Sequence, residues 1–425
     1  MPKGTPSRFG RGVTTTMVKL AATAAVAVVL AACSSTTASS SSSSGAAAGP
    51  AAPAPTADPA AVAATVKKMF LTDIPVDSLN PVIKQTVTTA STPWTDAMQT
   101  KLVGCLQTDS CEIGQGLTVA FPNDNQGPWR QTFRAELTAQ AIQSGVVGKV
   151  IYSLGTDVAS WLANFKSLIA QRPDVIVIDS IYGPAIAPAV QQAKAAGIVV
   201  VSVETPLPDS VKSIVDAEAT SNICGMYTEG AKKTVAAAGK PGGYGLYTGV
   251  PGNASAASWQ PCLVKGLESA GWNKAIEGFT QWTPQGMTQA ANSLYASGTN
   301  PSAIAYDYTM EYFAAPYLKD GKTPPILLSD AVNSAFLKQA KDAQAQNVNI
   351  QGFTANARSW YGRIGLTAGI LLKQGQPVDK QIDIPYPTAA VSEILPTFDL
   401  AMPANAPVPT SFNAAQEAQI LGTGA

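Results

Sequence analysis

Near the middle of the chain, two continuous apolar runs flank a stretch with helical spacing. Residues 173–179 are mostly apolar without alternation and rich in β-branched side chains, which is typical of a strand buried on both faces of a parallel sheet. Residues 181–196 place apolar side chains at helical intervals, and Gly197 ends that stretch before a second apolar run over 198–203. The pattern predicts a strand, a crossover helix and a second parallel strand.

The same pattern repeats along most of the chain. From Leu117 to Glu204 it predicts four strands joined by crossover helices. It then starts again with a short strand at 213–215 and continues through alternating helices and strands to Phe353. We therefore expect an α/β fold of two doubly wound, Rossmann-like lobes. A cleft between such lobes is a favoured site for small ligands.

Glu204 is the first candidate for ligand contact. It ends the second of the two central strand patterns. Open α/β sheets bind ligands beyond the carboxyl ends of their strands, so a carboxylate at this point is well placed. A carboxylate that only caps a loop would give the same pattern.

The first 116 residues follow a different pattern. Residues 1–32 contain basic residues, an uncharged stretch too short to cross a bilayer, and then small residues, as secretory signal peptides do. Residues 33–61 consist almost entirely of Ser, Thr, Ala, Gly and Pro, which predicts a disordered tether. Residues 62–116 contain helical patterns over 62–70 and 94–107, and we expect them to form a helical prefix packed on the main domain.

The composition removes several classes of function. The chain has 425 residues and no histidine, which excludes histidine-dependent nucleophiles and imidazole metal ligands. Four of its 28 basic residues, Lys3, Arg8, Arg11 and Lys19, lie in the leader, so 24 basic residues face 28 acidic ones in the rest of the chain. This acidic balance gives no electrostatic reason to expect nucleic-acid binding. We expect neither a cofactor nor a metal.

Of the five cysteines, one stands alone in the leader and the other four form two candidate pairs. Cys33 follows Leu30-Ala31-Ala32, and these four residues resemble the lipobox of bacterial lipoproteins, which implies a lipid-anchored Cys33. Ordinary cleavage beside a chance cysteine is the alternative. The remaining four cysteines predict two disulfides, Cys105 with Cys111 and Cys224 with Cys262. A zinc site is the competing interpretation, although the spacings do not form two short ligand pairs.

From Leu117 to about Met402 the order of elements resembles the type I periplasmic binding proteins, in particular the ribose-binding branch that delivers sugars to ABC importers. Three local sequences carry the resemblance. They are Ala120-Phe121-Pro122-Asn123 followed by Pro128-Trp129-Arg130, the strand that ends at Glu204, and the glycine-rich turn from Gly249 to Ala256.

The resemblance implies that the chain crosses three times between the lobes, near 216–221, 354–359 and 383–386. The first lobe would then comprise 117–218 and 357–383. The second lobe would comprise 219–356 and 384–402, and 403–425 would form a C-terminal tail.

The resemblance also implies roles for single positions. Asn123 falls where the family binds a hydroxyl group, and Asn356 matches the family's amide near the last crossing between the lobes. Trp129 and Trp282 fall where aromatic rings stack on a sugar. The implied ligand-binding set is Asn123, Trp129, Arg130, Glu204, Trp282, Asp307, Tyr308, Asp330 and Asn356. A sugar has apolar ring faces and a belt of hydroxyl groups, which suits aromatic side chains surrounded by carboxylates, amides and guanidinium groups.

Structural roles are the alternatives at these positions. Arg130 replaces a second aromatic residue of the family, and it could be a solvated charge at the rim. Asp330 matches an acidic ligand residue, while Asp307 and Tyr308 flank a polar contact, but an Asp after a strand also serves as a helix N-cap. Either tryptophan could be a packing residue. A family arginine has no counterpart near 259–262, which leaves the sugar's identity open.

The sequence thus predicts an exported, lipid-anchored receptor on the outer face of the cytoplasmic membrane, which we expect to be a monomer. It would capture a sugar or polyol between two lobes and deliver it to the permease of an ABC importer. Two rival functions remain. One is an extracellular glycosidase that uses two of Glu204, Asp307 and Asp330, and the other is a ligand receptor for signalling.

Overall fold

The computed structural model describes residues 57–422. The predicted signal peptide, Cys33 and most of the predicted tether therefore lie outside the described residues. Among the helices in the described part, none is both long and apolar enough to cross a membrane.

The first lobe is built on a seven-stranded sheet with the order β1-β3-β2-β4-β5-β6-β13. Its strands are β1 (Ser110–Glu112), β2 (Leu117–Asn123), β3 (Val147–Leu154), β4 (Val175–Ile178), β5 (Val199–Glu204), β6 (Ala217–Ser221) and β13 (Gln381–Ile384). All neighbours pair in parallel except β1, which runs antiparallel to β3. This confirms the predicted parallel sheet.

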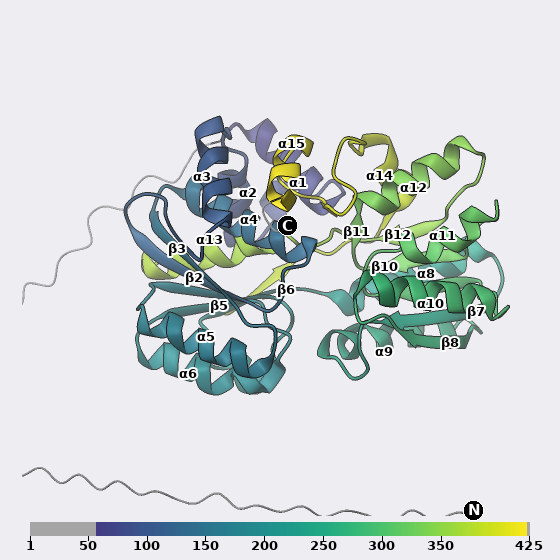
Figure 1. The fold of residues 1–425 in the computed structure, drawn as a ribbon, viewed down its shortest axis with the longest axis horizontal. Coiled ribbons are helices and arrows are strands. Elements are labelled where there is room, and N and C mark those ends of the chain that lie inside the picture. Colours follow the sequence, from purple (N-terminus) through teal and green to yellow (C-terminus); the bar gives the residue numbers. More distant parts are fainter. Residues whose placement is uncertain (1–56, 423–425) are drawn as a thin grey trace, which may run out of the picture. The chain divides into compact units, whose positions relative to one another are not determined.

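Helices cover both faces of this sheet, as Figure 1 shows. On one face lie α4 (Pro128–Ser144) and α13 (Tyr361–Lys373), and on the other α5 (Val158–Ala170) and α6 (Ala187–Ala195). Alternate residues of one strand enter the two layers: Val175 and Val177 pack with α4 and α13, and Ile176 and Ile178 pack with α5 and α6. Burial on both faces explains the unbroken apolar run seen in the sequence.

The second lobe repeats this plan with a six-stranded sheet of the order β14-β12-β10-β9-β7-β8. Its strands are β7 (Gly243–Thr248), β8 (Asn273–Phe279), β9 (Ala303–Tyr306), β10 (Ile326–Ser329), β12 (Gly352–Thr354) and β14 (Ala389–Ala390). The hydrophobic clusters on its two faces involve α8 (Ile223–Ala238) and α9 (Ala254–Glu268) on one side and α10 (Pro284–Ala296), α11 (Glu311–Lys319) and α12 (Ser334–Ala345) on the other. The predicted fold class is therefore confirmed.

One predicted strand is wrong. Residues 213–215 follow the short helix α7 (Asp209–Lys212) and continue its turn, because the amides of Ile214 and Val215 bond back to the carbonyl of Val211. The strand in this part of the chain is β6 instead. Its polar residues Glu218 and Thr220 interrupt the apolar pattern from which strands were predicted. Since β6 pairs with β5, the first lobe runs to Ser221 rather than to residue 218.

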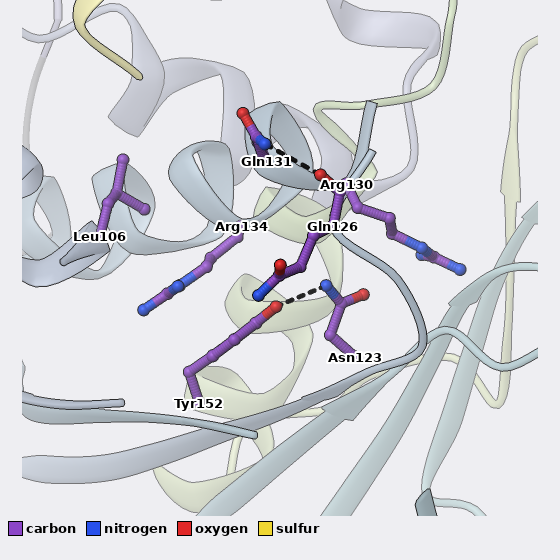
Figure 2. A pocket seen from close by; sticks show the side chains of 7 residues that line it. All are labelled: Leu106, Asn123, Gln126, Arg130, Gln131, Arg134 and Tyr152. Carbon is purple, nitrogen blue, oxygen red and sulfur yellow. Dashed lines mark hydrogen bonds between the residues drawn. The ribbon is translucent and has the colours of Figure 1, made fainter. Parts of the chain in front are cut away.

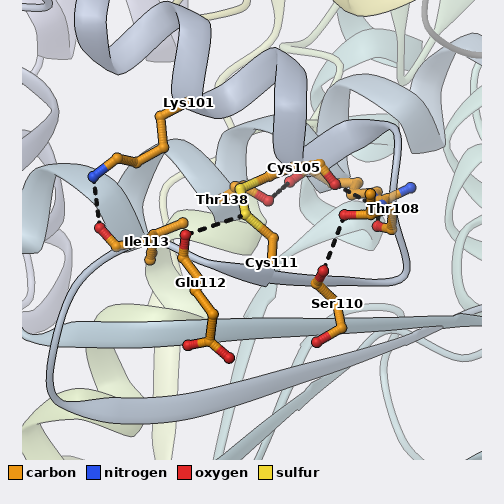
Figure 3. Close-up of a disulfide and its surroundings, with 9 residues drawn as sticks. Lys101, Cys105, Thr108, Ser110, Cys111, Glu112, Ile113 and Thr138 are labelled. Atoms are coloured by element: carbon orange, nitrogen blue, oxygen red, sulfur yellow. Dashed lines mark hydrogen bonds between the residues drawn. A yellow bond between two sulfur atoms is a disulfide. The ribbon is translucent and has the colours of Figure 1, made fainter.

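The prefix consists of α1 (Pro59–Phe70), α2 (Pro81–Ala90), α3 (Asp96–Leu106) and β1. α1 begins inside the stretch that the sequence assigned to the tether, and α2 was not predicted. Side chains of α1 and α2 belong to the same hydrophobic cluster as α4 and α13, so the prefix completes one face of the first lobe. The Cys105–Cys111 disulfide closes the turn between α3 and β1 (Figure 3). The predicted Cys224–Cys262 disulfide is also present and ties α8 to α9.

The described part of the last segment, 403–422, is structured and is not a tail. β15 (Pro407–Val408) pairs with β11 (Val332–Asn333), while α15 (Ala414–Gly422) packs on α3 and α4. The chain therefore crosses between the lobes after β6, after β12, after β13 and again after β15. The remaining helical elements are α14 (Val391–Ile394) and three short 3₁₀ turns at Val76–Ser78, Gly183–Ile186 and Leu395–Thr397.

Candidate functional site

The polar residues of the candidate site lie where parallel strands end. In the first lobe Asn123 closes β2, Asp179 follows β4 and Glu204 closes β5. In the second lobe Asp307 follows β9 and Asp330 follows β10. The carboxyl ends of parallel strands lie at one edge of a sheet, which brings side chains from distant parts of the sequence together.

Arg130 is buried in the first turn of α4, with 5% of its surface exposed. Its Nε and Nη2 donate to the two carboxylate oxygens of Asp124 at 2.9 and 2.8 Å, and its Nη1 donates to Asp179. Burial alone would lower the pKa of Arg130, but Asp179 and Asp124 outweigh it and raise that pKa. Arg130 is therefore a paired charge and not a solvated residue at the rim.

Arg358 joins carboxylates from both lobes. It lies in the crossing between β12 and α13, with a left-handed backbone (φ 60°). Its Nη1 lies 2.7 Å from Oε1 of Glu204, and its Nη2 donates to Oδ2 of Asp330 at 2.9 Å. The predicted residue Asn356 holds this crossing, because its Oδ1 accepts from the Arg358 amide at 3.0 Å. Burial raises the pKa of Asp330 to about 7, although Arg358 opposes the shift.

Asp307 and Trp282 form a second group in the second lobe. Trp282 Nε1 donates to Oδ1 of Asp307 at 3.0 Å, and the other oxygen accepts from Thr248 and from Trp259. Burial raises the pKa of Asp307 to about 6, although these hydrogen bonds oppose the shift. The Trp282 ring lies so close to Gly249 that a Cβ there would come within 2.0 Å of it. Neither Asp307 nor Asp330 is a helix N-cap, since α11 and α12 begin after Met310 and Asn333.

Trp129 and Tyr308 have structural contacts that place them less directly for ligand binding than the charged residues at the strand ends. Trp129 Nε1 donates to the carbonyl of Ala357, and its ring packs 5.3 Å from that of Phe133. Trp129 and Tyr308 line the same small cavity, of about 10 Å³. Trp129 therefore packs α4 against the crossing that carries Arg358.

Asn123, at the end of β2, lines a pocket of about 80 Å³, which Figure 2 shows. Its Nδ2 donates to the Tyr152 hydroxyl at 2.7 Å, and the Arg134 guanidinium stacks 3.6 Å from the centre of the Tyr152 ring. The residues that line the pocket are Leu106, Asn123, Gln126, Arg130, Gln131, Arg134 and Tyr152. Since Leu106 ends α3, the prefix forms part of this wall.

Four buried polar atoms of the site receive no hydrogen bond from, and make none to, any other described residue: Asn123 Oδ1, Asp330 Oδ1, Asn356 Nδ2 and Arg358 Nε. Buried polar atoms are almost always paired, so each such atom needs an explanation. Two are acceptors and two are donors. Hydroxyl groups of a ligand, which both donate and accept, could satisfy all four.

The space between the strand ends is nearly filled by the protein itself. The cavity beside Glu204 and Arg358 measures about 10 Å³, room for roughly one water molecule. It is also lined by Ser221, Ser255 and Ser258. A ligand the size of a sugar therefore requires the lobes to separate or Arg358 to move.

Sequence reasoning missed Asp124, Asp179 and Arg358. Asp179 carried a usable signal, because it follows an apolar strand pattern as Glu204 does. Asp124 and Arg358 lie in loops without such a pattern. Among the described residues, no group of three or more Cys, Asp or Glu is arranged to hold a metal ion.

Two α/β lobes have polar side chains at their strand ends, and one of the crossings between them carries Asn356 and Arg358, which is the architecture of a two-lobed binding protein. Residues 117–376 match the family model described as the periplasmic binding protein domain, and the chain belongs to this family. No curated protein matches the chain.

Solved structures with the same fold cover about two thirds of the chain. The periplasmic binding protein component of the arabinose ABC transporter from Shewanella sp. ANA-3, bound to α- and β-L-arabinofuranose, is 15% identical with a TM-score of 0.59, over 66% of this chain and 94% of that one. An ABC transporter solute-binding protein from Bacillus halodurans C-125 with bound myo-inositol is 14% identical with a TM-score of 0.57, over 68% and 99%. One from Thermobispora bispora DSM 43833 is 21% identical with a TM-score of 0.55, over 64% and 84%.

Proposed function

We propose that the protein captures a sugar or sugar-like polyol between its two lobes and delivers it to an ABC importer. The observation that carries the proposal is the bridge from Arg358 to Glu204 and Asp330, with unpartnered buried atoms on Arg358 and Asp330. A residue from the crossing that contacts both lobes can sense whether they are closed on a ligand. The family, and relatives solved with bound arabinofuranose and myo-inositol, support the ligand class.

The proposed ligand-binding residues are those that combine buried polar atoms with a strand end or a crossing. We retain the whole predicted set: Asn123, Trp129, Arg130, Glu204, Trp282, Asp307, Tyr308, Asp330 and Asn356. We add Arg358. Each hydrogen bond to a charged group contributes about 1.5–3 kcal/mol, so several would support micromolar binding after the costs of ordering.

Closure is proposed to be a population shift. A ligand that contacts both lobes binds the closed form better than the open form, and this differential affinity drives closure. The closed form would be the one that the permease recognises.

Anchoring and location form part of the proposal. We propose that Cys33 carries the lipid and that the Ser, Ala and Pro-rich tether holds a monomeric receptor outside the cytoplasmic membrane. The resemblance of residues 30–33 to a lipobox and the two disulfides support export, because disulfides persist in oxidising compartments. Metabolic labelling with a fatty acid, abolished by Cys33→Ala, tests the anchor.

We propose binding without catalysis. A glycosidase needs one carboxylic acid free to protonate the leaving group and a second free carboxylate. Arg358 engages Glu204 and Asp330 together, and three donors engage Asp307. Both features support a binding role. No observation favours signalling over transport.

Calorimetry of the purified mature protein against a panel of pentoses, hexoses and polyols tests the proposal. Saturable binding of at least one compound, with no change in the compound, supports it. Product release from aryl glycosides, or no binding to any compound by a folded protein, contradicts it.

A further inference from the structure

The site between the lobes contains more buried negative charge than positive charge. Its carboxylates are those of Asp124, Asp179, Glu204, Asp307 and Asp330, and its guanidinium groups are those of Arg130 and Arg358. All seven residues are buried or nearly so, and each arginine already pairs with two carboxylates. With every group ionised, five negative and two positive charges leave a surplus of three negative charges.

The seven charged groups interact electrostatically as one cluster. Glu204 raises the pKa of Asp179 and of Asp330, and Asp307 also raises that of Asp330, although burial is the larger cause for both residues. Within the described residues no lysine forms an ion pair with any of the five carboxylates. Asp307 has only the neutral donors Thr248, Trp259 and Trp282 as hydrogen-bond partners. The surplus is therefore not compensated by the described part of the chain.

A buried uncompensated carboxylate is unfavourable and must be protonated or paired with a cation. The described carboxylates are not arranged to hold a metal ion, which leaves protonation or an organic cation supplied by the ligand. Two of the unpartnered buried atoms, Asn123 Oδ1 and Asp330 Oδ1, are acceptors. An ammonium group offers three donors and one positive charge, so it could donate to an acceptor such as Asp330 Oδ1 and reduce the surplus.

We propose that the preferred ligand is a hydroxyl-bearing compound with a protonated amine, such as an amino sugar or an amino polyol. In the structure, the Arg358 guanidinium lies between Glu204 and Asp330, and a protonated amine could pair with the same carboxylates once the lobes separate or Arg358 moves. This inference rests on the proposed function and narrows its ligand class.

Matched sets of sugars test the inference by calorimetry on the purified mature protein. Each set has a neutral sugar, its amine and its N-acetylated amine: glucose, glucosamine and N-acetylglucosamine, and the galactose series. In at least one set we expect the amine to bind about tenfold or more tightly than both neutral members, as for a buried charge pair. If the neutral members bind as tightly as the amines, the inference is overturned and the proposed function stands. If no member of any set binds although a pentose or polyol of the wider panel does, the inference is overturned and the proposed function stands; no binding to any compound of the sets or the panel overturns both.

Charge-removing variants separate this effect from stereochemistry. Glu204→Gln keeps the side chain's shape and its acceptor oxygen, and it is expected to reduce the ratio of amine affinity to neutral-sugar affinity about tenfold, whatever its effect on the neutral affinity itself. Asp307→Asn provides a second variant if Glu204→Gln does not fold. Glu229→Gln removes an exposed charge from α8, outside the site, and should leave the preference unchanged. An unchanged preference in both site variants overturns the inference.

Discussion

Arg358 joins Glu204, at the end of β5, to Asp330, after β10, with nitrogen–oxygen distances of 2.7 and 2.9 Å. These two carboxylates belong to different lobes and lie 126 positions apart in the sequence. A single side chain from the second crossing therefore links the two strand-end edges.

Replacing this link should destabilise the protein. In Arg358→Ala, two buried carboxylates lose their cation, and we expect the free energy of unfolding to fall by about 3–5 kcal/mol. Urea denaturation at pH 7 measures the loss. Lys322→Ala serves as the control, because its ion pair with Asp320 is exposed and should contribute far less than the buried bridge. Equal losses in the two variants would contradict a structural role for the bridge.

Removing Trp282 or Asp330 should weaken sugar binding without unfolding the protein. Trp282 supplies the partly buried aromatic surface of the second lobe, and Asp330 supplies an unpartnered acceptor. We expect Trp282→Ala and Asp330→Ala each to weaken binding of the best ligand by about tenfold or more, since each removes about 1.5 kcal/mol or more of contact. Calorimetric affinity that is unchanged in both variants would remove these residues from the site.

Gly249 should tolerate no side chain, because its Cβ would come within 2.0 Å of the Trp282 ring. Gly249→Ala must displace the ring, and we expect a loss of about 1–3 kcal/mol in unfolding free energy together with weaker ligand binding. Gly104→Ala is the matched control. It lies inside α3 with open space around it, and it should stabilise the protein by about 0.5–1 kcal/mol. A harmless Gly249→Ala would show that the ring is free to move.

Glu417 should make the stability depend on pH. This carboxyl on α15 is buried, and burial raises its pKa to about 7 from an ordinary 4.5, although hydrogen bonds from Thr132 and Thr410 and the charge of Lys68 oppose the shift. Because the folded pKa lies above the unfolded one, the folded state binds the proton more tightly. The contribution of Glu417 is therefore lost as pH rises from 4.5 to 7, by up to about 3 kcal/mol.

Comparison of wild type with Glu417→Gln isolates this effect, because Asp179, Asp307 and Asp330 titrate in the same direction in both proteins. Urea denaturation at pH 5 and pH 8 should show a smaller difference between the two pH values for the variant. A difference of the same size in both proteins would exclude Glu417 as a source.

The sequence by itself determined those strands and helices whose burial requires a regular pattern of apolar residues along the chain. The runs that became β4 and β5 are buried on both faces of a sheet, so every position in them before Glu204 is apolar or small, and the sequence pattern predicts the strands. Glu204 and Asp330 could be selected for the same reason, since each ends or follows such a run. The pattern failed at β6, whose alternate positions are polar and whose apolar neighbours Ile214 and Val215 lie in a turn.

Only the tertiary structure decided which of these groups meet. Arg358 lies in a crossing with no periodic pattern, and its partners are distant in the sequence, so its pairing follows from how the two sheets are placed. The same holds for the last segment, where β15 reaches the second lobe and α15 returns to the first. Local sequence specifies which residues of a strand or helix are buried and where that element ends. Contacts between charges that are distant in the sequence depend on how the whole lobes pack.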